Sequence, residues 1–294
     1  MLAAVLAAAC TGGFAATWWL LVTRPTGQLM ERVALDGSRI GAHFVSDHAR
    51  NLLHVVSLPA AVGLVLVVLI GALWRGSRRR ALWAAGAVVA INISAQLLKY
   101  LILSRPDYGL SEKASGANTL PSGHTAVAAS AAVALILVVG PRWRGPAAWA
   151  GALLTAAMGY STLVCQWHRP ADVVAAILLA VAWGAVAVAC GAWGDELPEP
   201  SAPGRVPAAA VLGGLGILAA AAALALEVLT WRAMIAIDAG SVLGAAQAAT
   251  RSVAFVAYAA GAVGTVAMSA TAMAALALLT PRDTVAGRRD EHAG

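Results

Sequence analysis

Long apolar runs alternate with short polar connections along most of the chain. Each run is about 20 residues long, which suits a helix that crosses the hydrocarbon core of a bilayer. Eight runs are predicted to be transmembrane helices: 2–23, 52–74, 81–103, 121–140, 147–165, 172–193, 208–230 and 253–279. The pattern therefore predicts an all-α fold, a polytopic membrane helix bundle.

The first apolar run has no Lys or Arg before it and ends near Trp18 and Trp19. A signal peptide begins with a positively charged segment, so we expect a retained helix instead. Residues 24–51 are polar and are predicted to form an interfacial helix or loop. His43 and His48 within them are candidate metal ligands, but no further ligand has a matching spacing, and a solvated face is the expectation.

The composition excludes a water-soluble globular protein, because 60% of the 294 residues are hydrophobic and only 12% are charged. Eighteen Arg against two Lys, with abundant Ala, Val, Gly and Leu, are typical of a high-GC bacterial genome. The net charge of +6 lies in short loops and suits anionic lipid headgroups. The sequence contains no basic helix with interleaved aromatic residues, so we expect no nucleic-acid partner. The three cysteines, none with metal-ligand spacing, are expected to be buried in the membrane without disulfides: Cys10, Cys165 and Cys190.

The loops at residues 75–80 and 142–144 are rich in arginine, which marks them as cytoplasmic. With eight spans, both termini are then cytoplasmic, as expected for a multi-pass protein of the bacterial plasma membrane. Asn92, Ser94 and Gln96 in the third span are predicted to form interhelical hydrogen bonds.

The chain divides into a six-span core and a C-terminal part. The predicted parts are the core at 1–193, a cytoplasmic linker at 194–207, two additional spans at 208–279 and a cytoplasmic tail at 280–294. Glu227 in the seventh span is an intramembrane acid and so a candidate functional group, but a local ion pair is expected because Arg232 is close in the sequence. Three special roles are open for the last two spans: a homodimer face, a lateral wall for a prenyl chain, or a docking surface. Ordinary helix packing is the default expectation.

Candidate chemistry lies between the fifth and sixth spans. His168 and Asp172 are four residues apart, and Pro170 suits the first turn of a new helix. A carboxylate one turn into the helix can orient the imidazole and hold it in one tautomer. Such a pair is by itself more often a helix cap or a tertiary hydrogen bond.

Two further polar groups flank the loop between the third and fourth spans. Lys99 and Arg105 end the third span, and Pro121-Ser122-Gly123-His124 opens the fourth. A helix start of this type has free N–H groups and a positive dipole end, so it can bind an anion. The predicted topology places these groups and His168 on the same outer face. Residues with unrelated structural roles would be scattered over both faces, so this convergence indicates one extracytoplasmic active site.

These three motifs resemble those of the type 2 phosphatidic acid phosphatase superfamily of integral-membrane lipid phosphatases. The family pattern is Lys with a downstream Arg-Pro, then Pro-Ser-Gly-His, then Ser-Arg followed by His and by Asp four residues later. The corresponding residues are Lys99 and Arg105-Pro106, then 121–124, then Ser161-Thr162 with His168 and Asp172. The motifs occur in the family's order over roughly residues 50–193.

The resemblance implies a metal-independent phosphatase without a cofactor. His168 would attack phosphorus to give a phosphohistidine, oriented by Asp172, and His124 would protonate the leaving oxygen. The implied phosphate-binding groups are Lys99, Arg105, Ser122, the Gly123 backbone N–H, Ser161 and the residue after it, Thr162.

The sequence departs from the family pattern at two places. Five residues instead of six separate Lys99 from Arg105, and Thr162 replaces an arginine that would bind phosphate oxygens in a bidentate manner. We expect Arg169 to supply the missing charge. The implied substrate is a membrane lipid, with a slight preference for polyprenyl pyrophosphate over phosphatidic acid and phosphatidylglycerol phosphate. Two other functions stay open, a lipid-linked phosphotransferase and a non-catalytic lipid binder or transporter with a degenerate phosphate clamp.

Overall fold

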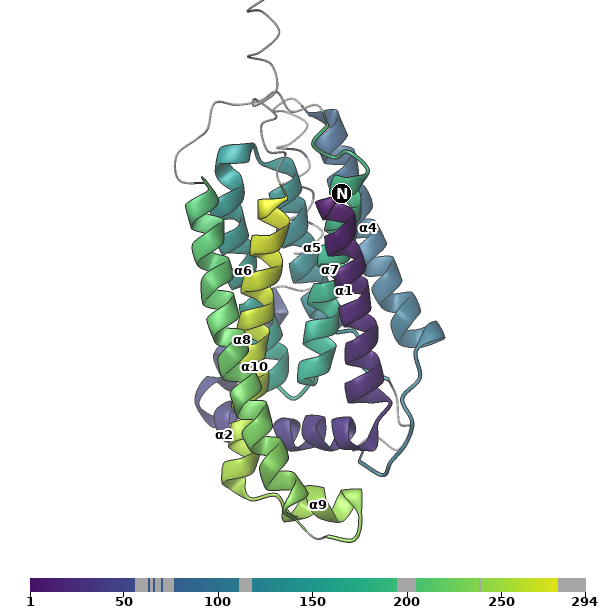
Figure 1. Ribbon diagram of the computed structural model, residues 1–294, viewed down its shortest axis with the longest axis vertical. Coiled ribbons are helices and arrows are strands. Elements are labelled where there is room, and N and C mark those ends of the chain that lie inside the picture. The colour runs from purple at the N-terminus through teal and green to yellow at the C-terminus, as the bar shows by residue number, and fades with distance from the viewer. Residues whose placement is uncertain are drawn as a thin grey trace, which may run out of the picture.

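The computed structural model describes residues 1–55, 77–110, 118–194, 205–237 and 239–279, together with the isolated positions 63, 66 and 70. Side chains at 41, 43–55 and 205–207 are outside this description, so His43 and His48 are too. All the regular elements in the described part are helices: α1 (Leu2–Thr17), η1 (Trp18–Val22), α2 (Pro25–Val55), α4 (Arg78–Leu97), η2 (Leu98–Ile102), α5 (Gly123–Val138), η3 (Pro141–Trp143), α6 (Arg144–Val164), α7 (Pro170–Ala189), α8 (Arg205–Ile235), α9 (Val242–Ala248) and α10 (Arg251–Leu278). The predicted all-helical membrane bundle is therefore confirmed (Figure 1).

Six helical segments in the described part are long and apolar enough to cross a membrane: Leu2–Val22, Arg78–Ile102, Pro141–Val164, Pro170–Ala189, Ala208–Ile235 and Arg251–Leu278. A seventh predicted span corresponds to the shorter apolar helix α5. With 16 residues, α5 is about 24 Å long, less than the hydrocarbon thickness. The predicted span 52–74 falls almost entirely outside the described residues.

Helices α5 and α7 form the centre of the bundle and are built largely from alanine and valine. Nearly every residue of α5 from Thr125 to Leu137 is buried. Without a hydrophobic force between helices in lipid, association depends on close packing and interhelical hydrogen bonds. The predicted hydrogen bonds of Asn92 and Ser94 are confirmed: Asn92 Nδ2 donates to Ser130 Oγ at 3.2 Å, and Ser94 Oγ accepts from Trp183 Nε1 at 3.0 Å. The same prediction is wrong for Gln96, whose side chain lines a cavity and has no hydrogen bond to another helix in the described part of the chain.

The polar segment after the first span is the long helix α2. Figure 1 shows its N-terminal part lying across one end of the bundle, below α1 and α7. Of the two predicted alternatives, helix or loop, the structure has the helix. Gly37 allows α2 to approach α10 closely, because a Cβ there would lie 1.8 Å from Ala254 O.

Helix α10 packs against α2, α6 and α7, and α8 packs on α10. Gly261 of α10 backs onto the first residue of α7, since a Cβ at this position would lie 2.4 Å from Pro170 Cγ. The expected ion pair of Glu227 with Arg232 is wrong, because neither side chain has an ion-pair partner in the described part of the chain. Glu227 instead lines a cavity of about 340 Å³ together with Glu31 and apolar residues of α7, α8 and α10. Hydropathy alone could not show that α8 turns this carboxyl toward the bundle.

Candidate active site

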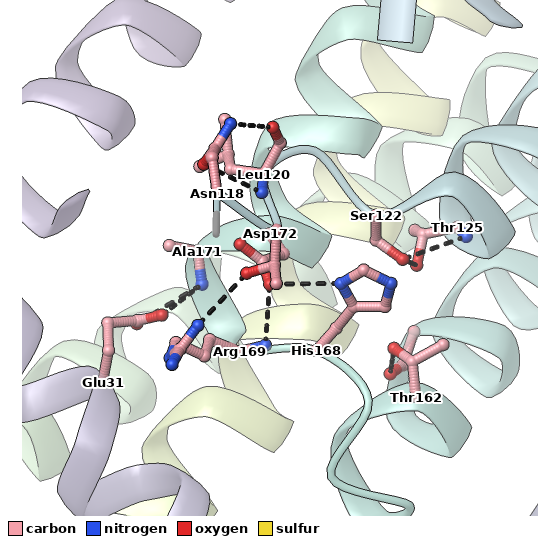
Figure 2. A network of polar contacts seen from close by, with 12 residues as sticks. Glu31, Asn118, Leu120, Ser122, Thr125, Thr162, His168, Arg169, Ala171 and Asp172 are labelled. Atoms are coloured by element: carbon pink, nitrogen blue, oxygen red, sulfur yellow. Dashed lines mark hydrogen bonds and ion pairs between the residues drawn. The ribbon is translucent and has the colours of Figure 1, made fainter. Parts of the chain in front are cut away.

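The start of α7 holds the imidazole and the carboxylate that the sequence singles out. Arg169 is the N-cap and Pro170 the first helical residue. The Asp172 Oδ2 atom lies 3.1 Å from His168 Nδ1 and accepts from Arg169 N at 3.0 Å. One buried carboxylate therefore caps the helix and orients the imidazole (Figure 2).

This contact fixes the role of each imidazole nitrogen. An ionised carboxylate only accepts hydrogen bonds, so Nδ1 carries the proton and Nε2 keeps its lone pair. The His168 side chain is 8% exposed and lines a cavity. His168 therefore has the orientation that a nitrogen nucleophile needs.

The loop that carries His168 is a tight reversal at the end of α6. The N–H groups of Trp167 and His168 both donate to Thr162 O, at 3.0 and 3.3 Å. Gln166 has φ 59°, in the left-handed region that non-glycine residues seldom adopt. Local strain of this kind persists only where surrounding contacts hold it.

The start of α5 lies directly against the start of α7. Ser122 N donates to Asp172 O at 2.9 Å, and the buried Ser122 hydroxyl caps α5 by accepting from Thr125 N and Thr125 Oγ1. A Cβ on Gly123 would meet no atom closer than 3.9 Å, so the backbone here is open to the cavity. A backbone hydrogen bond therefore joins the motif at 121–124 directly to the start of α7.

His124 lies on the first turn of α5 and lines the same cavity as His168. Its ring packs against Trp167, with centroids 5.4 Å apart and planes tilted by 53°. The two imidazoles thus approach one cavity from different segments, His124 from the first turn of α5 and His168 from the loop before α7. That arrangement suits a nucleophile and an acid that act on opposite sides of one phosphorus atom.

The cationic side chains come from the end of the third predicted span and from the α7 cap. Lys99 lies in η2, lines the cavity, and has its carbonyl held by Asn118 Nδ2 at 3.3 Å. Burial, together with the nearby charge of Arg169, lowers the pKa of Arg105 to about 10, while Asp172 and Glu31 act in the opposite direction. Arg105 therefore stays charged at neutral pH.

Arg169 lies at the position where the sequence predicts a replacement for the missing arginine. Its Nη1 donates to Thr119 Oγ1 at 3.1 Å. The Nε–H groups of Arg105 and Arg169 are buried and have no acceptor among the described residues. Two neighbouring guanidiniums with unused donors suit a phosphate, which supplies negative charge and acceptor oxygens together.

Ser161 and Thr162 are both buried in the last turn of α6. The Ser161 hydroxyl donates to Ala157 O at 2.8 Å, and the Thr162 hydroxyl donates to Gly159 O at 2.7 Å. Both hydroxyls are thus used within their own helix. Phosphate binding by these two residues stays a prediction.

The cavity beside the two histidines has a volume of about 600 Å³. Its lining combines polar groups, among them the two imidazoles and Lys99, with aliphatic side chains of α4 and α5. The lining residues are Asn92, Ile93, Gln96, Leu97, Lys99, Tyr100, Gly123, His124, Val127 and His168. Among the described side chains, no group of three or more His, Cys, Asp and Glu residues could hold a metal ion.

Several residues around the site were not predicted from the sequence. Asn118 and Thr119 hold the Lys99 carbonyl and the Arg169 guanidinium, and Glu31 of α2 contacts Ala171 of α7 (Figure 2). Glu31 belongs to a polar segment far from the motifs. The sequence gives only one hint that Glu31 has a structural role, namely that an acidic residue stands among apolar positions of an amphipathic helix. This hint does not identify the residue that Glu31 contacts.

The fold is that of a polytopic helical bundle, with several helices long and apolar enough to cross a membrane. The model of the PAP2 superfamily matches residues 80–194, a segment that contains all three motifs. The predicted family resemblance is thereby confirmed, and the match supports phosphatase activity. The matched segment begins at residue 80 and not near residue 50, so α1 and α2 lie outside it. No curated protein and no solved structure matches the chain significantly.

Proposed function

We propose that this protein is a metal-independent membrane phosphatase that hydrolyses a lipid phosphate or pyrophosphate through a phosphohistidine at His168. The observation that carries the proposal is the 3.1 Å contact between His168 Nδ1 and Asp172 Oδ2, beside a cavity shared with His124 and Lys99. An imidazole oriented in this way presents Nε2 as the nucleophile.

In the first step, Nε2 of His168 attacks phosphorus and the bond from phosphorus to the lipid oxygen breaks. His124 donates a proton to that oxygen, so the product leaves as an alcohol or as a lipid monophosphate. The imidazolium that forms is stabilised by the Asp172 carboxylate. In the second step, water gives a proton to His124 and attacks the phosphohistidine. The P–N bond breaks and inorganic phosphate is released.

The phosphoryl oxygens are held by cations and by a helix start. Lys99, Arg105 and Arg169 supply positive charge, and the α5 N-terminus at Gly123 supplies backbone N–H groups and the positive end of a dipole. Preorganised donors of this kind stabilise charge that develops in the transition state. Arg169 compensates for the guanidinium that Thr162 does not provide.

A lipid substrate is favoured by the position of the cavity on α4. Ile93 and Leu97 line the cavity and are also 54% and 43% exposed on the bundle surface, where Leu101 and Ile102 continue the apolar face. A phosphate at the histidines can therefore have its hydrocarbon chain lying along α4 in the bilayer. Among such lipids we favour polyprenyl pyrophosphate, because wall polymerisation delivers it to an outward-facing bacterial phosphatase. Phosphatidic acid and phosphatidylglycerol phosphate are the alternatives.

The test is release of inorganic phosphate by the purified protein in detergent. The panel comprises polyprenyl pyrophosphate, phosphatidic acid, phosphatidylglycerol phosphate and a water-soluble phosphomonoester, with kcat/KM for each. We expect the lipids to exceed the soluble ester, and polyprenyl pyrophosphate to have the highest value. His168→Gln, which keeps a polar side chain of similar size, should abolish turnover, and the wild type should form an acid-labile phosphoryl adduct on the peptide that contains His168.

Equal background release by the wild type and by His168→Gln across the panel would reject the phosphatase and favour a lipid binder. A phosphoryl adduct that passes to an added hydroxyl compound in preference to water would instead identify a phosphotransferase.

A further inference from the structure

One face of α2 contacts separate segments of the candidate active site. Gln28 is buried, and its Nε2 donates to Val22 O at 2.7 Å and to Pro106 O at 2.8 Å. One turn further on, Arg32 Nη1 donates to Leu110 O at 3.3 Å. Side chains three to four residues apart share a helix face. This face therefore holds the loop that carries Arg105.

Glu31, on the same face, contacts the start of α7. Its carboxyl oxygens lie 3.1 and 3.3 Å from Ala171 N, and the side chain is almost completely buried. Pro170 has no N–H, and the N–H groups of Asp172 and Val173 are bonded to Arg169 O. Ala171 therefore carries the one N–H in the first three residues of α7 that needs an acceptor from another segment, and Glu31 supplies it.

The loop before α7 is also attached to α2. Gln166, the residue with positive φ, donates from Nε2 to Leu35 O at 3.1 Å, one turn beyond Glu31. His168 thus lies between two attachments to α2, at Gln166 on one side and at Ala171 on the other. Because the chain is held on both sides, the imidazole and its carboxylate have little freedom to shift relative to the cavity.

We infer that Glu31 is a positioning residue for the phosphoryl-transfer step, acting through the Ala171 N–H on the His168–Asp172 pair. The inference rests on the proposed phosphatase function and deepens it, because it places part of the machinery in a helix outside the segment that matches the family. Glu31 does not line the cavity of the two histidines and forms no ion pair with Arg105 or Arg169 in the described structure, although their charges act on it. We therefore expect a larger effect on kcat than on KM.

The experiment compares three substitutions at Glu31 in the full-length protein. Glu31→Ala removes the acceptor, and we expect kcat to fall on the order of 10-fold to 10²-fold, the effect of a small misplacement of reacting groups, with KM changed less than about threefold. Glu31→Gln keeps an acceptor oxygen at the same reach and should retain kcat within about threefold of the wild type. Glu31→Asp, which is shorter by one methylene, should behave like Glu31→Ala and covers the case in which the alanine variant does not fold.

Glu227→Gln is the matched control, since Glu227 lines the same 340 Å³ cavity as Glu31 without a hydrogen bond to α7 in the described structure. We expect its kcat and KM to equal those of the wild type.

A second readout does not require turnover: the ring ¹⁵N shifts of His168, assigned by comparison with His168→Gln. The wild type and Glu31→Gln should show one Nδ1-protonated tautomer, and Glu31→Ala a mixture.

Wild-type kcat and a wild-type ring tautomer in Glu31→Ala would overturn the inference. Equal losses in Glu31→Gln and Glu31→Ala would also overturn it, because the amide oxygen can still accept from Ala171. Absence of turnover in the wild type would reject the proposed function, and the ¹⁵N comparison would still decide the role of Glu31.

Discussion

The protonation of Glu31 should make the stability of the protein depend on pH. The pKa of this carboxyl is raised from 4.5 to about 8, mainly by burial and also by the charge of Asp172, while the Ala171 hydrogen bond and the Arg169 charge act against the shift. The Glu227 carboxyl also raises the pKa, and Arg105 is near enough to interact. The folded protein therefore keeps a proton on Glu31 at pH values where the unfolded chain releases it.

The sign and the size of the effect follow from proton linkage. Between pH 4.5 and about 8 the folded state binds one more proton than the unfolded state, so stability falls as pH rises. The contribution is fully present below pH 4.5 and is lost as pH rises through 8. One proton corresponds to about 1.4 kcal/mol for each pH unit. From pH 5 to pH 7.5 the wild type should lose about 3 kcal/mol of unfolding free energy that a neutral side chain would not lose.

Glu31→Gln isolates this effect, because the amide does not titrate. The assay is denaturant unfolding in detergent micelles at half-unit pH steps, followed by tryptophan fluorescence, for both proteins. The other titrating groups are common to both, so the difference between the two curves reports Glu31. Curves that stay parallel to within about 0.5 kcal/mol over this range would show that Glu31 is ionised in the folded protein, and the reasoning from burial would be refuted.

Four further substitutions test other parts of the structure. Asp172→Asn should lower kcat by on the order of 10²–10⁴ with little change in KM, because the amide no longer fixes the His168 tautomer; a smaller loss in steady-state assays would contradict that role. Arg169→Ala should raise the KM for lipid phosphate by roughly tenfold or more, and unchanged kinetics would remove Arg169 from the phosphate site. Thr162→Ala should keep kcat/KM within about threefold, since its hydroxyl is used inside α6, whereas a loss above about tenfold would restore it to the phosphate site. Gly261→Val should destabilise the protein by about 1–3 kcal/mol through overpacking against the start of α7, and an unchanged Tm in detergent would contradict the close approach of α10.

The sequence predicted most of the spans because their signal is local. A run of about 20 apolar residues must be helical in lipid whatever surrounds it, since its backbone polar groups have no other partners. The first span was predicted at 2–23 and is Leu2–Val22, and the last was predicted at 253–279 and is Arg251–Leu278. The start of α7 was predicted for the same reason, because Pro170 and Asp172 act within one turn.

The motifs predicted which residues meet, but not how each one is held. Successive spans cross the membrane in opposite directions, and this alternation placed Lys99, His124 and His168 at one end of the bundle. All three line one cavity. The sequence could not indicate that Arg144, assigned to a cytoplasmic loop, is buried with its guanidinium 3.5 Å from the centroid of the Trp193 ring. It also could not indicate that Glu227 turns into the bundle.

The sequence by itself determined the helices, their order and the chemical groups of the site, since each depends on neighbours within about 20 residues. Only the tertiary structure decided which helix holds the site in place. Glu31 and Ala171 are 140 positions apart in the chain and meet because α2 lies across the end of the bundle. A buried N–H needs an acceptor, but the sequence does not say which segment provides it. Every polar residue of a connecting helix is a candidate until the position of that helix in the fold is known.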